Sequence, residues 1–285
     1  MSWIIGVVIV FASVLGGYVL SHGDLIALWQ PFELVIIGGA AIGSFISSNP
    51  LKVIKNVGSK LPYLLRGSRY TKSLYMEMLA LLFQLFNKWR REGLVGLEED
   101  VEEPESSPIF NAYPHLTRDE KVMNFIIDYL RIISSGNMTA HELESLMEAD
   151  IETVFEEAEI AADSVTKVAD ALPGFGIVAA VLGIVITMKS IGGPPEELGV
   201  HVAAALVGTF LGILMAYGFV GPIGTMMGHM AREEVKYLEC IKVSILAMLG
   251  GIPPQMAVEF GRKTLYTSER PTFIELEEHV KSRSD

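Results

Sequence analysis

Residues 171–188 read ALPGFGIVAAVLGIVITM, a stretch without any acidic or basic side chain. An α-helix needs about 20 mostly apolar residues to cross a hydrocarbon layer about 30 Å thick. Three further stretches are equally free of charged residues, namely 2–20, 34–51 and 198–231. Together they predict an all-α integral membrane protein with four transmembrane helices and a large helical cytoplasmic domain between spans two and three.

The first and last stretches need separate interpretation. The first, 2–20, has neither a basic segment before it nor a small-residue cleavage site after it, so we expect a membrane helix and not a secretory signal. The last, 198–231, is longer than a bilayer requires. Its membrane part is expected between 200 and 221, and the remainder should continue as helix into water.

Lysine and arginine mark the cytoplasmic side, because basic residues near span ends resist translocation. The connection 21–33 contains neither, and the connection 189–199 contains only Lys189. Basic residues follow the second stretch at Lys52, Lys55, Lys60, Arg66, Arg69 and Lys72, and the fourth at Arg232, Lys236 and Lys242. We therefore expect both termini in the cytoplasm.

The charged segment 52–170 contains start and stop signals of helices. It has no alternation of polar and apolar residues long enough to indicate a β-strand. A helix is expected from Tyr70 to Arg91, with Gly93 as its terminator. The acidic segment 98–105 is expected as a loop, held by packing of apolar residues that follow it. These residues are Ile109, Phe110 and Tyr113.

Two Thr-x-x-Glu pairs have the spacing of a capping box, in which the two side chains satisfy the first backbone N–H groups of a helix. Thr117 with Glu120 precedes an expected helix over 122–134, closed by Gly136. Thr139 with Glu142 should open a long helix that runs unbroken towards the third apolar stretch.

The chain thus divides into four expected parts. These are a first transmembrane hairpin (1–51), a cytoplasmic helical domain (52–170), a second transmembrane hairpin (171–222) and a cytoplasmic helix with a tail (223–285). In the last part the helix should end at Leu249, and a short helix and an acidic tail at 275–278 should follow.

Composition excludes several classes of function. A net charge of −12 argues against nucleic acid as a partner, because nucleic-acid binding needs a basic surface. Cys240 is the only cysteine, so no intrachain disulfide forms. The six histidines are scattered, and no nucleophile or metal-ligand constellation is evident. We expect no enzyme activity, no metal and no cofactor.

No acidic residue lies well inside an apolar stretch. Glu33 stands at the outer entrance of the second, and His201 is near the outer end of the fourth. A proton or sodium relay through lipid normally uses a carboxylate at depth, despite a cost of about 2.5 to 3.5 kcal/mol or more. If the chain conducts ions, a partner must supply the acid.

Several uncharged residues in the third and fourth apolar stretches have both a functional and a purely structural interpretation. Pro173 and Pro222 each remove a backbone donor, but membrane helices often simply tolerate proline. Thr187 and Thr209 could line a wet path, although a threonine bonded back to its own helix is commoner. Two glycine pairs have the spacing for close helix approach and favour a tightly packed, oligomeric bundle: Gly39 with Gly43, and Gly208 with Gly212.

Longer motifs run along the whole chain. They are QPFELVII (30–37), SRYTK (68–72), LPGFGIVAA (172–180), VGTFLGI (207–213) with AYG (216–218), and VEFGRKTLY (258–266). With these motifs the chain resembles the MotA/PomA family of flagellar stator proteins, within the MotA/TolQ/ExbB superfamily.

The resemblance implies a multi-pass protein of the bacterial cytoplasmic (inner) membrane that forms a homo-oligomer, a pentamer in this family. The ring surrounds a dimer of a MotB-type subunit that carries the ion-binding aspartate and a peptidoglycan anchor, which fits the missing acid. The resemblance also implies that Pro173 and Pro222 couple ion passage to movement. Arg90 and Glu98 would contact the rotor protein FliG, although on the residues alone both would be ordinary solvated charges.

The same resemblance bears on the ion that is conducted. Sodium-driven members typically have a Thr in the third span where this chain has Ala180. Sodium needs oxygens to replace its hydration shell, whereas a proton needs only the partner's carboxylate. We therefore expect a proton-driven motor. Thr209 is shared by both kinds of motor and does not discriminate between them.

Two other classes of membrane protein remain as alternatives. An ExbB/TolQ-type energiser of outer-membrane processes also pairs with an aspartate-bearing partner, but such proteins usually have three spans. A secondary transporter would require polar residues or broken helices near the middle of the membrane, at corresponding positions of two repeated halves. No convincing inverted repeat is present.

Overall fold

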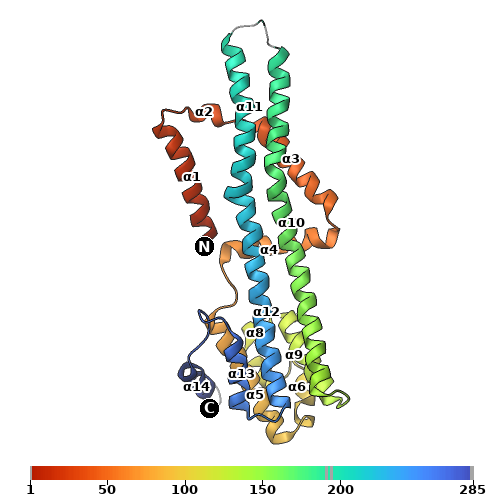
Figure 1. Ribbon diagram of the computed structural model, residues 1–285. Coiled ribbons are helices and arrows are strands. Elements are labelled where there is room, and N and C mark those ends of the chain that lie inside the picture. Colours follow the sequence, from red (N-terminus) through yellow and green to blue (C-terminus); the bar gives the residue numbers. More distant parts are fainter. Residues whose placement is uncertain (1, 190–191, 193–194, 283–285) are drawn as a thin grey trace. The chain divides into compact units, whose positions relative to one another are not determined.

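The computed structural model describes residues 2–189, 192 and 195–282, and every regular element within these ranges is helical (Figure 1). This result confirms the all-α prediction. Four helical segments have the length and apolar composition needed to cross a membrane. They are Trp3–Leu20, Leu25–Ser48, and parts of Ala140–Lys189 and Gly199–Leu249.

The first half of the chain forms ten elements. They are α1 (Ser2–Leu20), α2 (Leu25–Leu28), α3 (Pro31–Ser48), α4 (Leu51–Arg66), α5 (Lys72–Glu92), the 3₁₀ turn η1 (Val95–Leu97), α6 (Glu98–Glu102), α7 (Pro108–Asn111), α8 (Pro114–Thr117) and α9 (Glu120–Ser134). The second half forms α10 (Ala140–Lys189), α11 (Pro195–Met215), the π-helical turn η2 (Ala216–Val220), α12 (Gly221–Leu249), α13 (Pro254–Thr264) and α14 (Phe273–Ser282).

Two compact units divide the chain, and each contains segments from both halves. The first unit comprises Met1–Ser68 and Glu157–Met230, and the second comprises Arg69–Glu156 and Ala231–Asp285. The long helices α10 and α12 each contribute residues to both units. The membrane-spanning segments lie in the first unit, so the second unit is built from the charged middle and the C-terminal part.

The first unit leaves most of its apolar surface uncovered. Val8 and Ile9 are each 58 % exposed, and Leu206 is 68 % exposed. Two small clusters are buried within the described residues of this unit. One lies between α3, α10 and η2 and is formed by Ile37, Ala41, Leu172, Ala179 and Ala216. The other lies between α4, α10 and α12 and is formed by Val53, Val57, Leu64, Ala161, Ala162, Val165 and Met227. An apolar exterior of this extent suits contact with lipid or with further subunits.

The second unit has a large core with α5 at its centre. The apolar run of α5 is fully buried at Leu79, Leu82 and Phe86. Residues of α9, α12 and α13 pack against it, including Ile126, Ile241 and Val258. Because α5 is covered on several sides, its apolar residues are not confined to one stripe.

The predicted helix ends are mostly confirmed. Helix α5 ends at Gly93, whose φ of 73° lies in the left-handed region that glycine adopts without strain. The Thr139–Glu142 capping box is formed, with the Thr139 N–H donating to a Glu142 carboxylate oxygen over 2.8 Å. The helix that it opens runs unbroken to Lys189, as predicted.

Three local predictions are wrong. Thr117 does not cap α9, because Pro114 starts the short helix α8 and the Thr117 N–H bonds within that turn to the Tyr113 carbonyl. The acidic segment 98–105 is partly helical, as α6. The expected acidic tail is the helix α14, which begins with a second capping box, between Thr272 and Glu275.

Candidate functional site

Helices α10 and α11 touch backbone to backbone at glycine residues. A Cβ atom added to Gly212 would lie 2.8 Å from both the Gly176 Cα and the Leu172 carbonyl oxygen. One added to Gly176 would lie 2.9 Å from the Gly208 carbonyl oxygen. The spacing of Gly208 and Gly212 therefore predicted a real close approach. Gly39 and Gly43 have nothing within 4 Å of an added Cβ and make no such approach within the chain.

Ala180 and Thr209 lie at this crossing. An added Cβ on Gly208 would lie 3.2 Å from the Ala180 nitrogen, and one on Gly176 would lie 3.4 Å from the Thr209 Cα. Both residues are partly exposed. The two positions named from the sequence are thus brought together on facing helices.

The two threonines of the late spans differ. The Thr187 hydroxyl is buried and donates to the Gly183 carbonyl of its own helix over 2.8 Å, which leaves it unavailable to a passing ion. The Thr209 hydroxyl forms no hydrogen bond with any residue in the described ranges. Of these two hydroxyls, that of Thr209 is the one that has no hydrogen-bond partner among the described residues.

Pro222 is preceded by the π-helical turn η2, which no sequence pattern predicted. Proline has no N–H, and its ring would clash with the carbonyl four residues earlier, so the preceding turn widens. In this turn the Gly221 N–H donates to the Ala216 carbonyl, five residues back. The Pro222 ring itself is exposed.

Pro173 lies within α10 near the same level and interrupts its backbone hydrogen bonding without ending the helix. Its missing N–H would have bonded to the Ala169 carbonyl, four residues earlier. A Cβ added to Gly221 would lie 3.8 Å from the Ala169 Cβ, so the weakened turns of the two helices face each other. The sequence named both prolines, but it could not show that their interruptions are adjacent in space.

Arg90 and Glu98 belong to the second unit, whereas the residues at the crossing belong to the first. Arg90 is exposed in the last turn of α5, and Glu98 is the exposed first residue of α6. Within the described ranges neither side chain forms an ion pair. Both charges are therefore free to meet an external partner.

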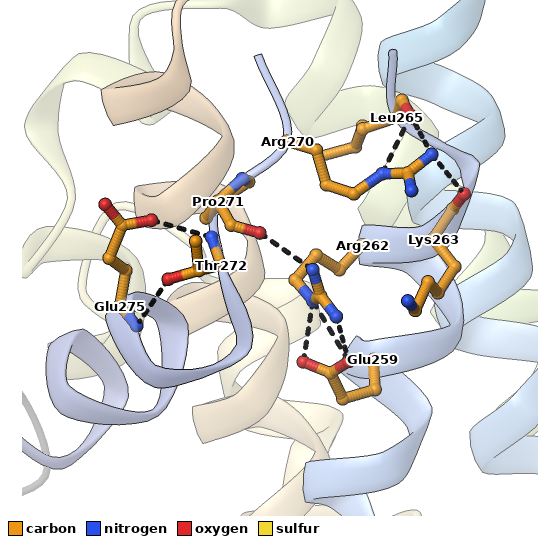
Figure 2. A network of polar contacts seen from close by, with 8 residues as sticks. All are labelled: Glu259, Arg262, Lys263, Leu265, Arg270, Pro271, Thr272 and Glu275. Atoms are coloured by element: carbon orange, nitrogen blue, oxygen red, sulfur yellow. Dashed lines mark hydrogen bonds and ion pairs between the residues drawn. The ribbon is translucent and has the colours of Figure 1, made fainter. Parts of the chain in front are cut away.

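Residues of the motif 258–266 and of the segment that follows it form a polar network around the buried Glu259 and Arg262 (Figure 2). The Arg262 guanidinium donates to both Glu259 oxygens, over 2.8 Å from Nε, and to the Pro271 carbonyl over 2.7 Å. Arg270 donates to the Leu265 carbonyl over 2.7 Å. The i, i+3 spacing of opposite charges was the available signal. The network fixes the connection between α13 and α14.

Glu275 ties α14 to α5. The Lys72 ammonium donates to its carboxylate over 2.7 Å, and the Thr272 N–H donates over 2.6 Å. These hydrogen bonds to the ionised form, Lys72 first, lower the pKa of Glu275 to about 2. No group of three or more His, Cys, Asp or Glu side chains in the described part of the chain could hold a metal ion.

Comparison with known proteins gives two matching families. The family of the motility protein A N-terminal region matches residues 4–93, and the MotA/TolQ/ExbB proton channel family matches residues 118–240. Motility protein A of Salmonella typhimurium is 52 % identical over 282 residues, which cover 99 % of this chain and 96 % of that protein. Chemotaxis protein LafT of Vibrio parahaemolyticus is 40 % identical over 277 residues, 97 % of each chain.

Two solved structures share the fold. The structure of C. jejuni MotAB matches with a TM-score of 0.76 at 21 % identity and covers 93 % of this chain and 96 % of that chain. The flagellar MotAB stator complex from Bacillus subtilis matches with a TM-score of 0.69 at 23 % identity and covers 98 % of each. The helical architecture described above is therefore that of these proteins.

Proposed function

The chain belongs to the motility protein A family, and from this membership we propose how it generates motion as a membrane subunit of the flagellar stator. Its role is ion-driven and not enzymatic, as in the MotA/TolQ/ExbB proton channel family. One observation supports the mechanism most strongly. The tight α10–α11 crossing presents a free Thr209 hydroxyl but no carboxylate of its own.

The missing carboxylate is supplied by a MotB-type subunit, which carries an ion-binding aspartate and a peptidoglycan anchor. The uncovered apolar faces of α1 and α11 support contact with other subunits, because apolar residues such as Val8 and Leu206 are largely exposed in the isolated chain. We propose a homo-oligomer, a pentamer as in the family, in the bacterial cytoplasmic membrane. Both termini face the cytoplasm.

The conducted ion is a proton. At the crossing, Thr209 offers one hydroxyl oxygen and Ala180 offers none. Sodium must exchange most of its hydration shell for oxygen ligands, whereas a proton can be carried on the partner's carboxylate alone. Each charge that crosses the membrane releases about 2.3 kcal/mol per 100 mV, which is the energy available for movement.

The adjacent interruptions at Pro173 and Pro222 convert this energy into movement. Helix segments that lack backbone hydrogen bonds bend more easily than regular helix, so a change in packing near Thr209 alters the course of α10 and of η2 with α12. Both helices continue into the second unit as regular helix. There, Arg90 and Glu98 contact charged residues of the rotor protein FliG.

An exposed ion pair suits a contact that must form and release repeatedly. Such pairs contribute only about 0.2 to 1 kcal/mol and weaken with salt. Arg90 and Glu98 are exposed and have no ion-pair partner within the described chain, so no internal bond must break before they meet the rotor.

Deletion of the gene tests the stator role. We expect paralysed cells with normal filaments, because a stator drives the flagellum without building it. Loss of filaments, or normal swimming in a cell without another stator, would contradict the proposal. Re-introduction of Arg90→Glu or Glu98→Lys chains should restore membrane assembly but only part of the swimming speed. A chain with Glu144→Lys, which reverses another exposed charge, is the matched control.

An energiser of the ExbB/TolQ type is a second candidate, because the family match over residues 118–240 includes those proteins. The match of residues 4–93 to the motility protein A N-terminal region favours the stator. Defective outer-membrane transport in the deletion strain, with normal swimming, would favour the energiser.

A further inference from the structure

Asp100 is a charged residue that the proposed mechanism does not use. It lies on the short helix α6, whose other acidic residues, Glu98, Glu99 and Glu102, are exposed, yet it is only 2 % exposed. A buried carboxylate is costly unless it is paired and hydrogen-bonded, so its position within a surface segment calls for an explanation.

Both oxygens of Asp100 are bonded to other elements. The Lys88 ammonium of α5 lies 2.7 Å from Oδ2, and the Ser107 hydroxyl donates to Oδ1 over 2.5 Å. The Ser107 oxygen in turn accepts the Phe110 N–H over 3.3 Å and caps α7. One carboxylate therefore joins α5, α6 and the start of α7. We call Lys88, Asp100 and Ser107 the Asp100 clamp.

The Asp100 clamp lies directly behind the two rotor-contact candidates. Lys88 and Arg90 are two residues apart on α5, and Glu98 and Asp100 are two residues apart on α6. Side chains two apart on a helix point roughly 200° away from each other. When Lys88 and Asp100 face inward and pair, Arg90 and Glu98 face outward.

A second contact joins α6 to α9. Arg131 of α9 donates to the Glu102 carboxylate over 2.8 Å and to the Val101 carbonyl over 3.2 Å. Both Arg131 and Glu102 are largely exposed, so this contact is weak. The buried clamp is the stronger restraint on the orientation of α6.

Stability alone does not account for an ion pair whose carboxylate is buried and whose ammonium is only partly exposed. Apolar residues of similar volume often stabilise a protein as well or better, and the best-attested use of a buried polar group is to select one arrangement. We propose that Lys88, Asp100 and Ser107 are positioning residues for the rotor contact. They hold α6 against the last turn of α5, so that Glu98 and Arg90 meet the rotor at a fixed spacing. This inference rests on the proposed role of Arg90 and Glu98.

The first variant removes one charge from the clamp. In Asp100→Asn, Lys88 loses its counter-charge, and α6 should open more often. We expect amide hydrogen exchange of residues 98–107 to accelerate about tenfold in the purified full chain, because local opening frees those amides. The torque per stator, read from the speed increments as single stators join a tethered motor, should fall by at least about half. Glu99→Gln, an exposed neighbour on α6, is the matched control for hydrogen exchange.

The second variant tests whether the clamp acts by orienting α6 or through the charges of Lys88 and Asp100 themselves. Lys88→Met with Asp100→Leu replaces the pair by apolar side chains of similar size, which should restore slow exchange and most of the torque per stator. If the double variant regains slow exchange but not torque, the charges act other than by positioning, and the inference is wrong. It is equally wrong if Asp100→Asn exchanges like the wild type, or exchanges faster with full torque.

Failure of the proposed function would look different. If Arg90→Glu and Glu98→Lys both retain full torque per stator, the rotor contact itself is refuted, whatever the exchange rates of the clamp variants. If those two variants lose torque while Asp100→Asn does not, only the positioning role is refuted.

Discussion

Gly176 and Gly212 show what single residues contribute at the α10–α11 crossing. The two backbones approach so closely that no side chain fits between them. In a membrane, where lipid is as apolar as the helix surface, close backbone packing is a main source of helix association. Small residues at this crossing therefore determine where Ala180 and Thr209 lie.

Gly212→Ala should damage this crossing. The new methyl group would stand 2.8 Å from the Leu172 carbonyl oxygen, so the helices must separate. We expect a loss of about 1 to 3 kcal/mol in unfolding free energy and non-motile cells. Gly174→Ala is the control, because its Cβ would meet nothing within 4 Å. Equal melting temperatures of the two detergent-solubilised variants would contradict this account.

Ala180 gives a second prediction at the residue scale. With a methyl group where a hydroxyl would serve as a sodium ligand, motility should not need sodium. Cells with this chain as their only stator should swim at unchanged speed when sodium is withdrawn at constant proton-motive force. A collapse of swimming speed would show that sodium is the coupling ion.

Helix ends that depend on nearby residues were mostly predicted from the sequence, whereas the Asp100 clamp, which joins separate elements, was not. The Thr139–Glu142 cap and the Gly93 terminator depend on residues within one helical turn, and the sequence predicted both. The false Thr117 cap had the same local pattern, but Pro114 starts a helix that includes Thr117. The Asp100 clamp joins segments twelve residues apart, and no spacing rule covers such a contact.

The π-helical turn η2 predicts the effect of replacing its proline. In Pro222→Ala the restored N–H can bond to the Gly218 carbonyl, and the turn should tighten to a regular α-helix. Stators should assemble in normal number but with less torque each. Pro62→Ala, at an exposed proline inside α4, should leave torque unchanged. Full torque from the Pro222 variant would remove this turn from the mechanism.

Helix α14 gives a prediction about pH. The Glu275 carboxylate has an ordinary pKa of 4.5 when unfolded and about 2 when folded. Its stabilising effect is therefore fully present above pH 4.5 and is lost as the pH falls through about 2. Glu275→Gln should lower the melting temperature at pH 6, and the difference from the wild type should shrink below pH 4.5. A difference that stays constant to pH 2 would rule out this linkage.

The whole molecule combines an apolar first unit with a compact, acidic second unit. Charge-free stretches were sufficient to predict the spans, because a bilayer imposes length and composition on each helix. The site was predicted only in part. The sequence named Pro173, Pro222, Ala180 and Thr209, but their meeting on facing helices depends on glycine contacts between segments far apart in the chain.

The absence of a carboxylate at the crossing predicts that the whole molecule does not conduct ions without a partner. Reconstituted alone in liposomes, the chain should carry neither a proton nor a sodium current, since the crossing of α10 and α11 has no acidic residue and Glu33 stands only in the first turn of α3. Co-reconstitution with a MotB-type subunit should produce a proton current, and replacing the partner's aspartate by asparagine should abolish it. A selective current from the chain alone would overturn the proposed division of labour.

Helix α1 has a consequence for the membrane in which the protein works. Its 19 residues extend about 28 Å, little less than the hydrocarbon thickness of an average bilayer. Helix α10 continues as helix beyond its apolar stretch and can slide or tilt to match thicker lipid, whereas α1 ends at Leu20, directly before the turn that leads to α2. In a bilayer of lipids with longer acyl chains, the hydrocarbon layer would exceed the length of α1 before that of α10. The fatty-acid composition should therefore set the greatest bilayer thickness at which the protein supports motility.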